Sequence, residues 1–177
     1  MIEVLDRPVA EVEAEALVRP VRTDWAAITT DGRQMELAAG EDWRQRCVAQ
    51  GELPLGSAAI TDAGALDAEF VIHVAVASEE QGATRRSVRR GLENGLRRAG
   101  EWDVTDVALP LLGTGPGALD PEASCRIMSP LLDAWAAARE GRRVRVCAPE
   151  PAARREALAR WPRAGRGGEP AGAAGDG

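Results

Sequence analysis

One continuous segment joins an apolar run to a glycine-rich turn and a helix start. It reads Asp106-Val107-Ala108-Leu109-Pro110-Leu111-Leu112, then Gly113-Thr114-Gly115-Pro116-Gly117-Ala118-Leu119, then Asp120-Pro121. The apolar run predicts a strand buried on both faces, and Asp120 before Pro121 is typical of a capped helix start. Glycines let backbone amides approach and surround an anion. The segment indicates a phosphate-binding loop, and a tight strand-to-helix turn without ligand stays an equal alternative.

The same alternation of strands and helices extends outward through the chain. The pattern predicts further strands at residues 2–5, 14–18, 70–77 and 144–147, with Pro20 ending the second. Helices are expected at 33–39, 41–49, 83–99, from 120 onward with a kink or break near Ser129, and 151–160. Helical crossovers between strands favour an α/β fold with a largely parallel sheet, whose ligands bind beyond the carboxyl ends of the strands.

Length and composition predict one domain, residues 1–161, and a disordered tail rich in Gly, Ala and Pro, residues 162–177. The chain has 177 residues, 45% hydrophobic and 28% charged. It contains no apolar run of about 20 residues, so we expect a cytoplasmic protein with no membrane partner. Three separated cysteines and one histidine do not suggest a metal site. No cofactor is expected.

Charge is distributed unevenly along the chain. The formal net charge is −6, all 22 basic residues are arginine, and six of these lie between residues 85 and 98 on the helix expected at 83–99. That helix face is open to two interpretations, a nucleic-acid surface and an ordinary solvated face. Nucleic acid is the disfavoured partner, because no aromatic residues are interleaved with the arginines to stack on bases.

Three segments in order resemble the macro domain family. Residues 56–64 are similar to its G-x-A-x-x-T-x-x-G segment, Phe70-Val71-Ile72-His73-Val74 to its V-I-H strand, and residues 107–115 to its second phosphate loop. The resemblance spans residues 56–128. It implies a three-layer fold, a mixed and mostly parallel sheet with helices on both faces. It also implies binding of ADP-ribose or a related phosphorylated nucleotide, and with it an ADP-ribosylated protein as partner. The implied ligand contacts are Val9, Gly113, Thr114, Gly115, Pro116, Gly117, Ala118 and Leu119.

The chain departs from the family at several ligand-binding positions. Arg19-Pro20-Val21-Arg22 stands at the family's N-A-A-N motif, and the first glycine loop is represented by residues 23–33, with Gly32 alone. Pro8 stands near the family's adenine-binding acid, with Asp6 as a displaced substitute, and Ala148-Pro149 replaces an aromatic residue. Arg19 and Arg22 have two open roles: guanidinium contacts to ligand phosphate, or positions in a solvated loop.

These changes retain the phosphate loop and remove the asparagines used by hydrolytic members. We therefore expect binding without efficient catalysis. The alternative is an ADP-ribosyl hydrolase or O-acetyl-ADP-ribose deacetylase with Asp24 or Asp120 as base. A further alternative is an interaction scaffold that binds no nucleotide.

Overall fold

A computed structural model describes residues 1–115 and 117–162. Pro116 of the glycine loop, and the predicted tail apart from Pro162, lie outside the described residues. Six strands form one sheet in the order β1-β6-β5-β2-β4-β3. All neighbouring pairs are parallel except β3 with β4. The strands are β1 Ile2–Leu5, β2 Ala14–Arg22, β3 Ala58–Asp62, β4 Ala68–Ala77, β5 Asp106–Pro110 and β6 Arg143–Cys147.

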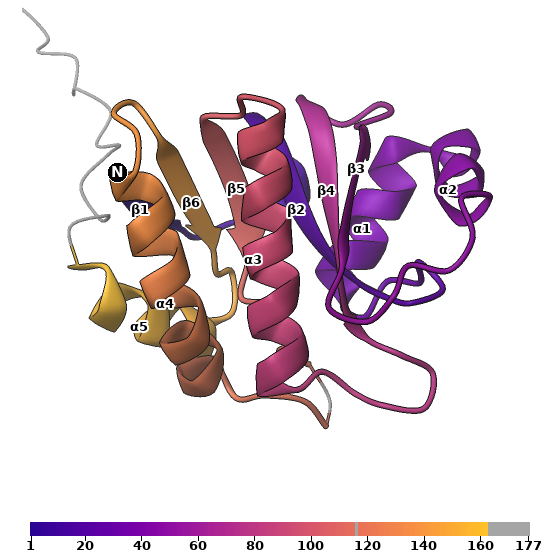
Figure 1. Ribbon diagram of the computed structural model, residues 1–177. Coiled ribbons are helices and arrows are strands. Elements are labelled where there is room, and N and C mark those ends of the chain that lie inside the picture. Colours follow the sequence, from indigo (N-terminus) through magenta and orange to yellow (C-terminus); the bar gives the residue numbers. More distant parts are fainter. Residues whose placement is uncertain (116, 163–177) are drawn as a thin grey trace, which may run out of the picture.

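Helices cover both faces of this sheet, which gives three layers (Figure 1). One face packs against α3, α4 and α5, and the other against α1, α2 and the short 3-10 helix η1. None of the described helices is long and apolar enough to span a bilayer. The bounds are η1 Val9–Glu11, α1 Thr30–Ala39, α2 Glu41–Val48, α3 Arg85–Glu101, α4 Pro121–Ala137 and α5 Pro151–Arg160. The predicted α/β class and three-layer arrangement are confirmed.

Side-chain alternation along the strands divides the core between the two faces. In β4, Ile72 and Val74 point into the layer under α3, whereas Val71 and Ala75 point into the layer under α1 and α2. The apolar stripe predicted on α3, from Val88 to Ala99, is buried in the first of these layers. A sheet buried on both faces explains the near-continuous apolar sequence of its central strands.

Two prolines do not end the elements that contain them. Strand β2 continues through Pro20, which is in register with Val74 of β4, so the expected end of the strand at Pro20 was wrong. Pro20 has no N–H to donate to a neighbouring strand. The β2–β5 pairing ends at Leu17, so no hydrogen bond to β5 is lost at Pro20. Helix α4 likewise continues past Pro130 as one element, so it is not broken near Ser129.

Candidate functional site

A cavity of about 720 Å³ opens at the carboxyl ends of β5 and β6. This is the position at which parallel α/β sheets bind ligands. Residues from the first turns of α1, α4 and α5 line it, so three positive helix-dipole ends meet at one cavity. The lining residues are Pro8, Ile28, Thr29, Thr30, Asp31, Arg33, Gln34, Pro110, Leu111, Thr114, Gly115, Pro121, Cys147, Ala148, Pro149, Glu150, Ala152 and Ala153.

The glycine loop forms one wall of the cavity through Thr114 and Gly115. Gly113 has a φ of +76°, and a Cβ built on it would lie 2.4 Å from Val88 Cγ2. Gly115, with a φ of +144°, also has a backbone that disfavours side chains. The Leu119 amide donates to Gly113 O at 2.9 Å, which closes the loop on itself. These contacts require glycine for the path of the backbone, as the sequence predicted for this turn.

The Thr114 hydroxyl does not have the orientation expected of a phosphate donor. It donates to the Leu111 carbonyl oxygen at 2.9 Å, so its hydrogen is used within the loop. Asp120 is similarly occupied, because its Oδ1 accepts from the Ala123 amide at 2.7 Å and caps α4. The loop therefore offers backbone groups and the α4 dipole in preference to side-chain donors.

The first turn of α1 forms the facing wall and includes a carboxylate that the sequence did not single out. Asp31 Oδ2 accepts from the Val9 amide at 3.4 Å, and its Oδ1 is buried without a hydrogen-bond partner among the described residues. Burial raises the pKa of Asp31, although the Val9 amide opposes this. The sequence signal that could have identified Asp31 is the helix start at Thr29-Thr30-Asp31. In the structure the Thr29 hydroxyl caps this helix by accepting from the Gly32 amide at 3.1 Å.

The predicted contact residue Val9 serves the site indirectly. Its side chain is buried in the core under α1, and its amide meets Asp31, while the preceding Pro8 lines the cavity. The cation on the cavity wall is Arg33, one turn into α1 and exposed. The predicted residues Thr114 and Gly115 thus meet Asp31 and Arg33 across the cavity, although α1 lies about 80 positions earlier in the sequence.

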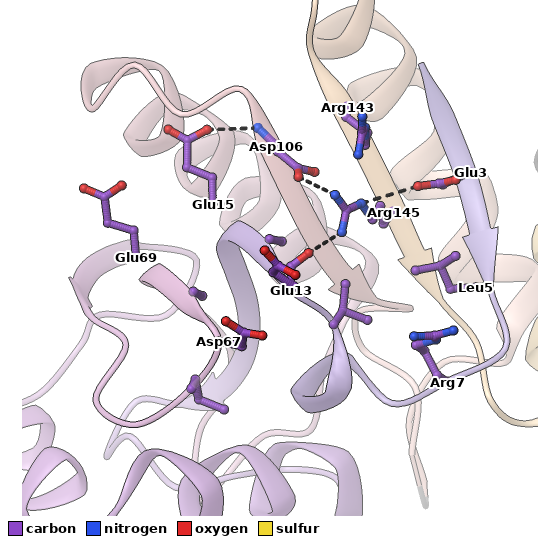
Figure 2. Close-up of a pocket in the computed structure, with 14 residues that line it drawn as sticks. Glu3, Leu5, Arg7, Glu13, Glu15, Asp67, Glu69, Asp106, Arg143 and Arg145 are labelled. Carbon is purple, nitrogen blue, oxygen red and sulfur yellow. Dashed lines mark hydrogen bonds and ion pairs between the residues drawn. The ribbon is translucent and has the colours of Figure 1, made fainter.

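A second and larger cavity lies elsewhere, on the sheet surface that α1 and α2 leave open. It has a volume of about 860 Å³, and Figure 2 shows Arg145 near its centre, between Glu3 and Asp106. Arg145 Nε lies 3.4 Å from Glu3 Oε1, and its NH2 pairs with Asp106. Burial raises the pKa of Asp106, with Arg145 opposing. Glu15 Oε2 accepts from the Thr105 amide at 2.7 Å. Arg145 is thus ion-paired with Glu3 and Asp106, and neither the described part of the glycine loop nor α4 lines this groove.

The segment from α1 to the first half of α4, which includes the glycine loop, matches a known protein family. The model of the Macro domain family matches residues 32–128, more than half of the chain. The chain belongs to the Macro domain family. The predicted resemblance is thereby confirmed, and the family fold is the α/β fold described above.

The chain is also similar to several uncharacterized proteins and to solved macrodomain structures. An uncharacterized protein of Aquifex aeolicus is 28% identical over 128 residues, which are 72% of this chain and 78% of that protein. In three further relatives, 28% to 32% identical, the match spans 58% to 65% of their length. The macrodomain of Thermus aquaticus DarG is 27% identical with a TM-score of 0.68, covering 84% of this chain and 99% of that one. An Oceanobacillus iheyensis macrodomain with ADP is 14% identical with a TM-score of 0.79, covering 92% and 90%.

Arg19, which the sequence placed at a ligand motif, lies inside the protein and does not line the cavity. Its side chain is 1% exposed, forms an ion pair with Glu36 of α1, and donates to the Trp25 carbonyl oxygen at 3.1 Å. Arg19 NH1 lies 3.3 Å from His73 Nδ1. Burial lowers the pKa of Arg19, and Glu36 opposes this effect. The sequence left two roles open for Arg19, a contact to ligand phosphate or a position in a solvated loop, and the buried side chain has neither role. It is a core residue of β2.

Arg22 ends β2 and is partly exposed, but it also lies outside the cavity lining. It forms an ion pair with Asp24. The hydrogen bond from Arg22 lowers the pKa of Asp24, so this carboxylate is a weaker base than an ordinary aspartate. Asp24 and Asp120, the two bases considered for hydrolysis, are thus engaged with Arg22 and with the start of α4.

The remaining departures from the family lie around the cavity wall formed by β6 and α5. Ala148 and Pro149, which the sequence analysis placed at an aromatic position of the family, line it. Asp6, the displaced substitute for the adenine-binding acid, forms an ion pair with Arg154 and is not part of the lining. The lining aspartate is Asp31, from α1. The acidic residues that line this cavity are Asp31 and Glu150, so neither is the Asp6 that the sequence suggested.

Proposed function

We propose that this macro domain binds ADP-ribose or a related phosphorylated nucleotide in the 720 Å³ cavity, without efficient catalysis. The observation that carries the proposal is the meeting of the glycine loop with the first turns of α1, α4 and α5 at one cavity. Amides and helix dipoles there favour a diphosphate. The volume is within the roughly 300–1,000 Å³ of small-molecule sites. A structurally similar macrodomain is described with ADP, which shares adenosine and diphosphate with ADP-ribose.

Two side chains of α1 give the ligand its orientation in this proposal. Arg33 is exposed at the wall and provides a guanidinium for a phosphate oxygen. The partnerless Oδ1 of Asp31 accepts an N–H or O–H of the ligand, such as a base amino group or a ribose hydroxyl. A ligand that provides this donor relieves a buried acceptor that is otherwise unsatisfied. The natural partner is then a protein that carries ADP-ribose.

Inefficient catalysis is supported by what occupies the altered positions. Arginines stand at both asparagine positions of the N-A-A-N motif, and each is held by a carboxylate of this chain, Arg19 by Glu36 and Arg22 by Asp24. Neither provides a neutral amide to orient a ribose. Asp120 caps α4 and is not directed at a substrate.

Calorimetric titration with ADP-ribose tests the proposal, with Gly115→Glu as the blocking variant. Gly115 lines the cavity, and a Cβ built on it points toward Thr29 Cγ2 at 3.9 Å, so the glutamate enters the site. Gly141→Glu is the matched control, because Gly141 also has a positive φ, +85°, and open space around it, but lies before β6 at the other end of the strand. We expect saturable binding by the parent and by Gly141→Glu, and none by Gly115→Glu. Absence of binding by the folded parent, or equal affinity in both variants, contradicts the proposal.

A second candidate, slow hydrolysis of an ADP-ribosyl bond, is favoured by one observation. Asp31 is a half-buried carboxylate with a raised pKa at the cavity, a combination typical of general bases. Incubation with an ADP-ribosylated protein distinguishes the two. Release of ADP-ribose by the parent but not by Asp31→Asn supports hydrolysis, and equal absence of release from both, with binding retained, supports the binding module.

A further inference from the structure

Some arginines of α3 pair with acidic residues of the same helix and others do not, and Arg89, which pairs with Glu93 at 3.0 Å, is the paired arginine of its N-terminal half among the described residues. In the C-terminal half, Arg97 and Arg98 both pair with Glu101, at 3.8 and 2.9 Å. In the N-terminal half, Arg85, Arg86 and Arg90 are exposed and have no ion pair within residues 1–115 and 117–162. We call these three residues the arginine face. The unbalanced charge is therefore local to the first turns of α3.

Positive charge at this position opposes the helix that carries it. The first turn of α3 contains no acidic residue, and Arg85 and Arg86 lie where the helix dipole is positive. The helix start is stabilised by a different device, the reciprocal hydrogen bonds between Thr84 and Ser87. Arg85 and Arg86 disfavour the helix start and have no ion pair among the described residues. An acidic group outside the chain would explain why they stand there.

The start of α3, which carries Arg85 and Arg86, lies next to the glycine loop, whereas Arg90 lies close to Gly56. Val88, one turn beyond Arg85, is the residue that Gly113 must avoid, since a Cβ on Gly113 would lie 2.4 Å from it. Gly82, just before α3, approaches the Gly117 carbonyl oxygen, with 3.9 Å between that atom and a Cβ built on Gly82. Figure 1 shows the loop passing the lower end of α3, where the helix begins. The start of α3 is therefore adjacent to the loop that forms one wall of the cavity.

The chemistry of this face fits a short acidic peptide better than a long polyanion. Guanidinium groups pair with carboxylates through two hydrogen bonds. Arg86 and Arg90 are four residues apart, so their Cβ atoms are separated by about 5–6 Å, which is close to the roughly 6.6 Å between alternate residues of an extended peptide. The net charge of −6 repels a long polyanion, whereas a short segment responds to the local patch. The exposed Trp102 follows the far end of α3, so it offers no base stacking at the arginine face.

We propose that the arginine face docks an acidic segment adjacent to the ADP-ribosylated residue of a partner protein. This inference rests on the proposed function for its ligand, but its surface is separate from the cavity. It assigns the macro domain a preference for ADP-ribosylated sites with aspartate or glutamate nearby. Free ADP-ribose does not reach the arginine face and is bound independently of it.

Fluorescence anisotropy with two labelled peptides tests this docking surface. Both carry ADP-ribose on a central serine, one with four flanking glutamates and one with four glutamines. The test variant is Arg85→Gln/Arg86→Gln, and the matched control is Arg97→Gln/Arg98→Gln, which removes the same charge from the paired end of α3. We expect the parent and the control to bind the acidic peptide roughly threefold to tenfold more tightly than the neutral one, from two partly exposed ion pairs. The test variant loses this preference, and higher salt weakens it.

Several results would overturn the docking proposal. They are equal affinity of the parent for both peptides, equal loss in the two double variants, and tighter binding of a single-stranded oligonucleotide than of the acidic peptide. Calorimetry with free ADP-ribose separates the two proposals. If free ADP-ribose does not bind, but an acidic peptide without ADP-ribose still binds the parent more tightly than Arg85→Gln/Arg86→Gln, the docking surface stands and the nucleotide site fails.

Discussion

The guanidinium group of Arg19 is ion-paired with the carboxylate of Glu36, which joins the carboxyl half of β2 to α1. The Arg19 side chain is 1% exposed and that of Glu36 19%, and Arg19 Nε is buried without a hydrogen-bond partner among the described residues. Removing one member of a buried pair leaves the other charge desolvated and uncompensated. Helix α1 carries Asp31 and Arg33 into the cavity, so this pair also holds one wall of the candidate site.

Replacing Glu36 by glutamine is expected to lower the free energy of unfolding by about 2–4 kcal/mol, less than for a fully buried pair because Glu36 is partly exposed. Urea denaturation measures this change. The control is Glu122→Gln, which breaks an exposed pair with Arg126 and should leave stability nearly unchanged. Equal effects of the two substitutions would mean that the Arg19–Glu36 pair adds nothing beyond a surface ion pair.

His73 makes stability depend on pH in a defined direction. Burial lowers its pKa well below the ordinary value, and Arg19 adds to this effect. The unfolded chain takes up a proton at this imidazole below about pH 6.5 while the folded chain does not, so stability is lost as the pH falls, by up to about 1.4 kcal/mol per pH unit. His73 is the single histidine. The parent should therefore lose stability between pH 7 and pH 5 relative to His73→Gln, and parallel pH profiles would refute the assignment.

Gly91 and Gly100 of α3 are expected to respond in opposite directions to alanine. A Cβ on Gly91 would lie 2.4 Å from Val74 Cγ1, whereas the closest atom to one on Gly100 is Arg142 NH2 at 3.8 Å. Gly91→Ala overpacks the contact with β4 and should destabilise the fold by about 1–3 kcal/mol. Gly100→Ala should stabilise it by up to about 1 kcal/mol through helix propensity. Thermal unfolding monitored by circular dichroism compares the two variants.

Asp31 is expected to make nucleotide affinity depend on pH. Its pKa is raised above the ordinary value of 3.8, so it takes up a proton at a higher pH than an ordinary aspartate. The neutral carboxyl is a weaker acceptor than the carboxylate, and affinity for ADP-ribose should fall as the pH falls through this pKa. Calorimetry across mildly acidic pH should show the fall in the parent and a flat profile in Asp31→Asn. A parent profile as flat as that of the variant would exclude a ligand contact through this carboxylate.

The sequence alone determined the α/β class, the macro domain resemblance and the glycine turn between β5 and α4. The fold class and the glycine turn depend on local signals, namely apolar runs, helical spacing on α3, and Asp120 with Pro121 at a helix start, whereas the resemblance depends on the similarity of three segments to family motifs. Such signals act between neighbours in the chain, so each can be read without knowledge of the rest of the fold. The two prolines were weaker signals, because β2 continues through Pro20 and α4 continues through Pro130.

The tertiary structure alone decided where the charged side chains lie. Arg19 was predicted at a ligand motif, but it is buried because Glu36 and His73, 17 and 54 positions away, are brought to it by α1 and β4. Asp31 enters the cavity because α1 packs against η1, 22 positions earlier in the chain. A buried charge needs partners that offset its desolvation, and those partners are remote in sequence. Local sequence patterns therefore determined the scaffold and its loop, whereas long-range packing determined which side chains face the cavity.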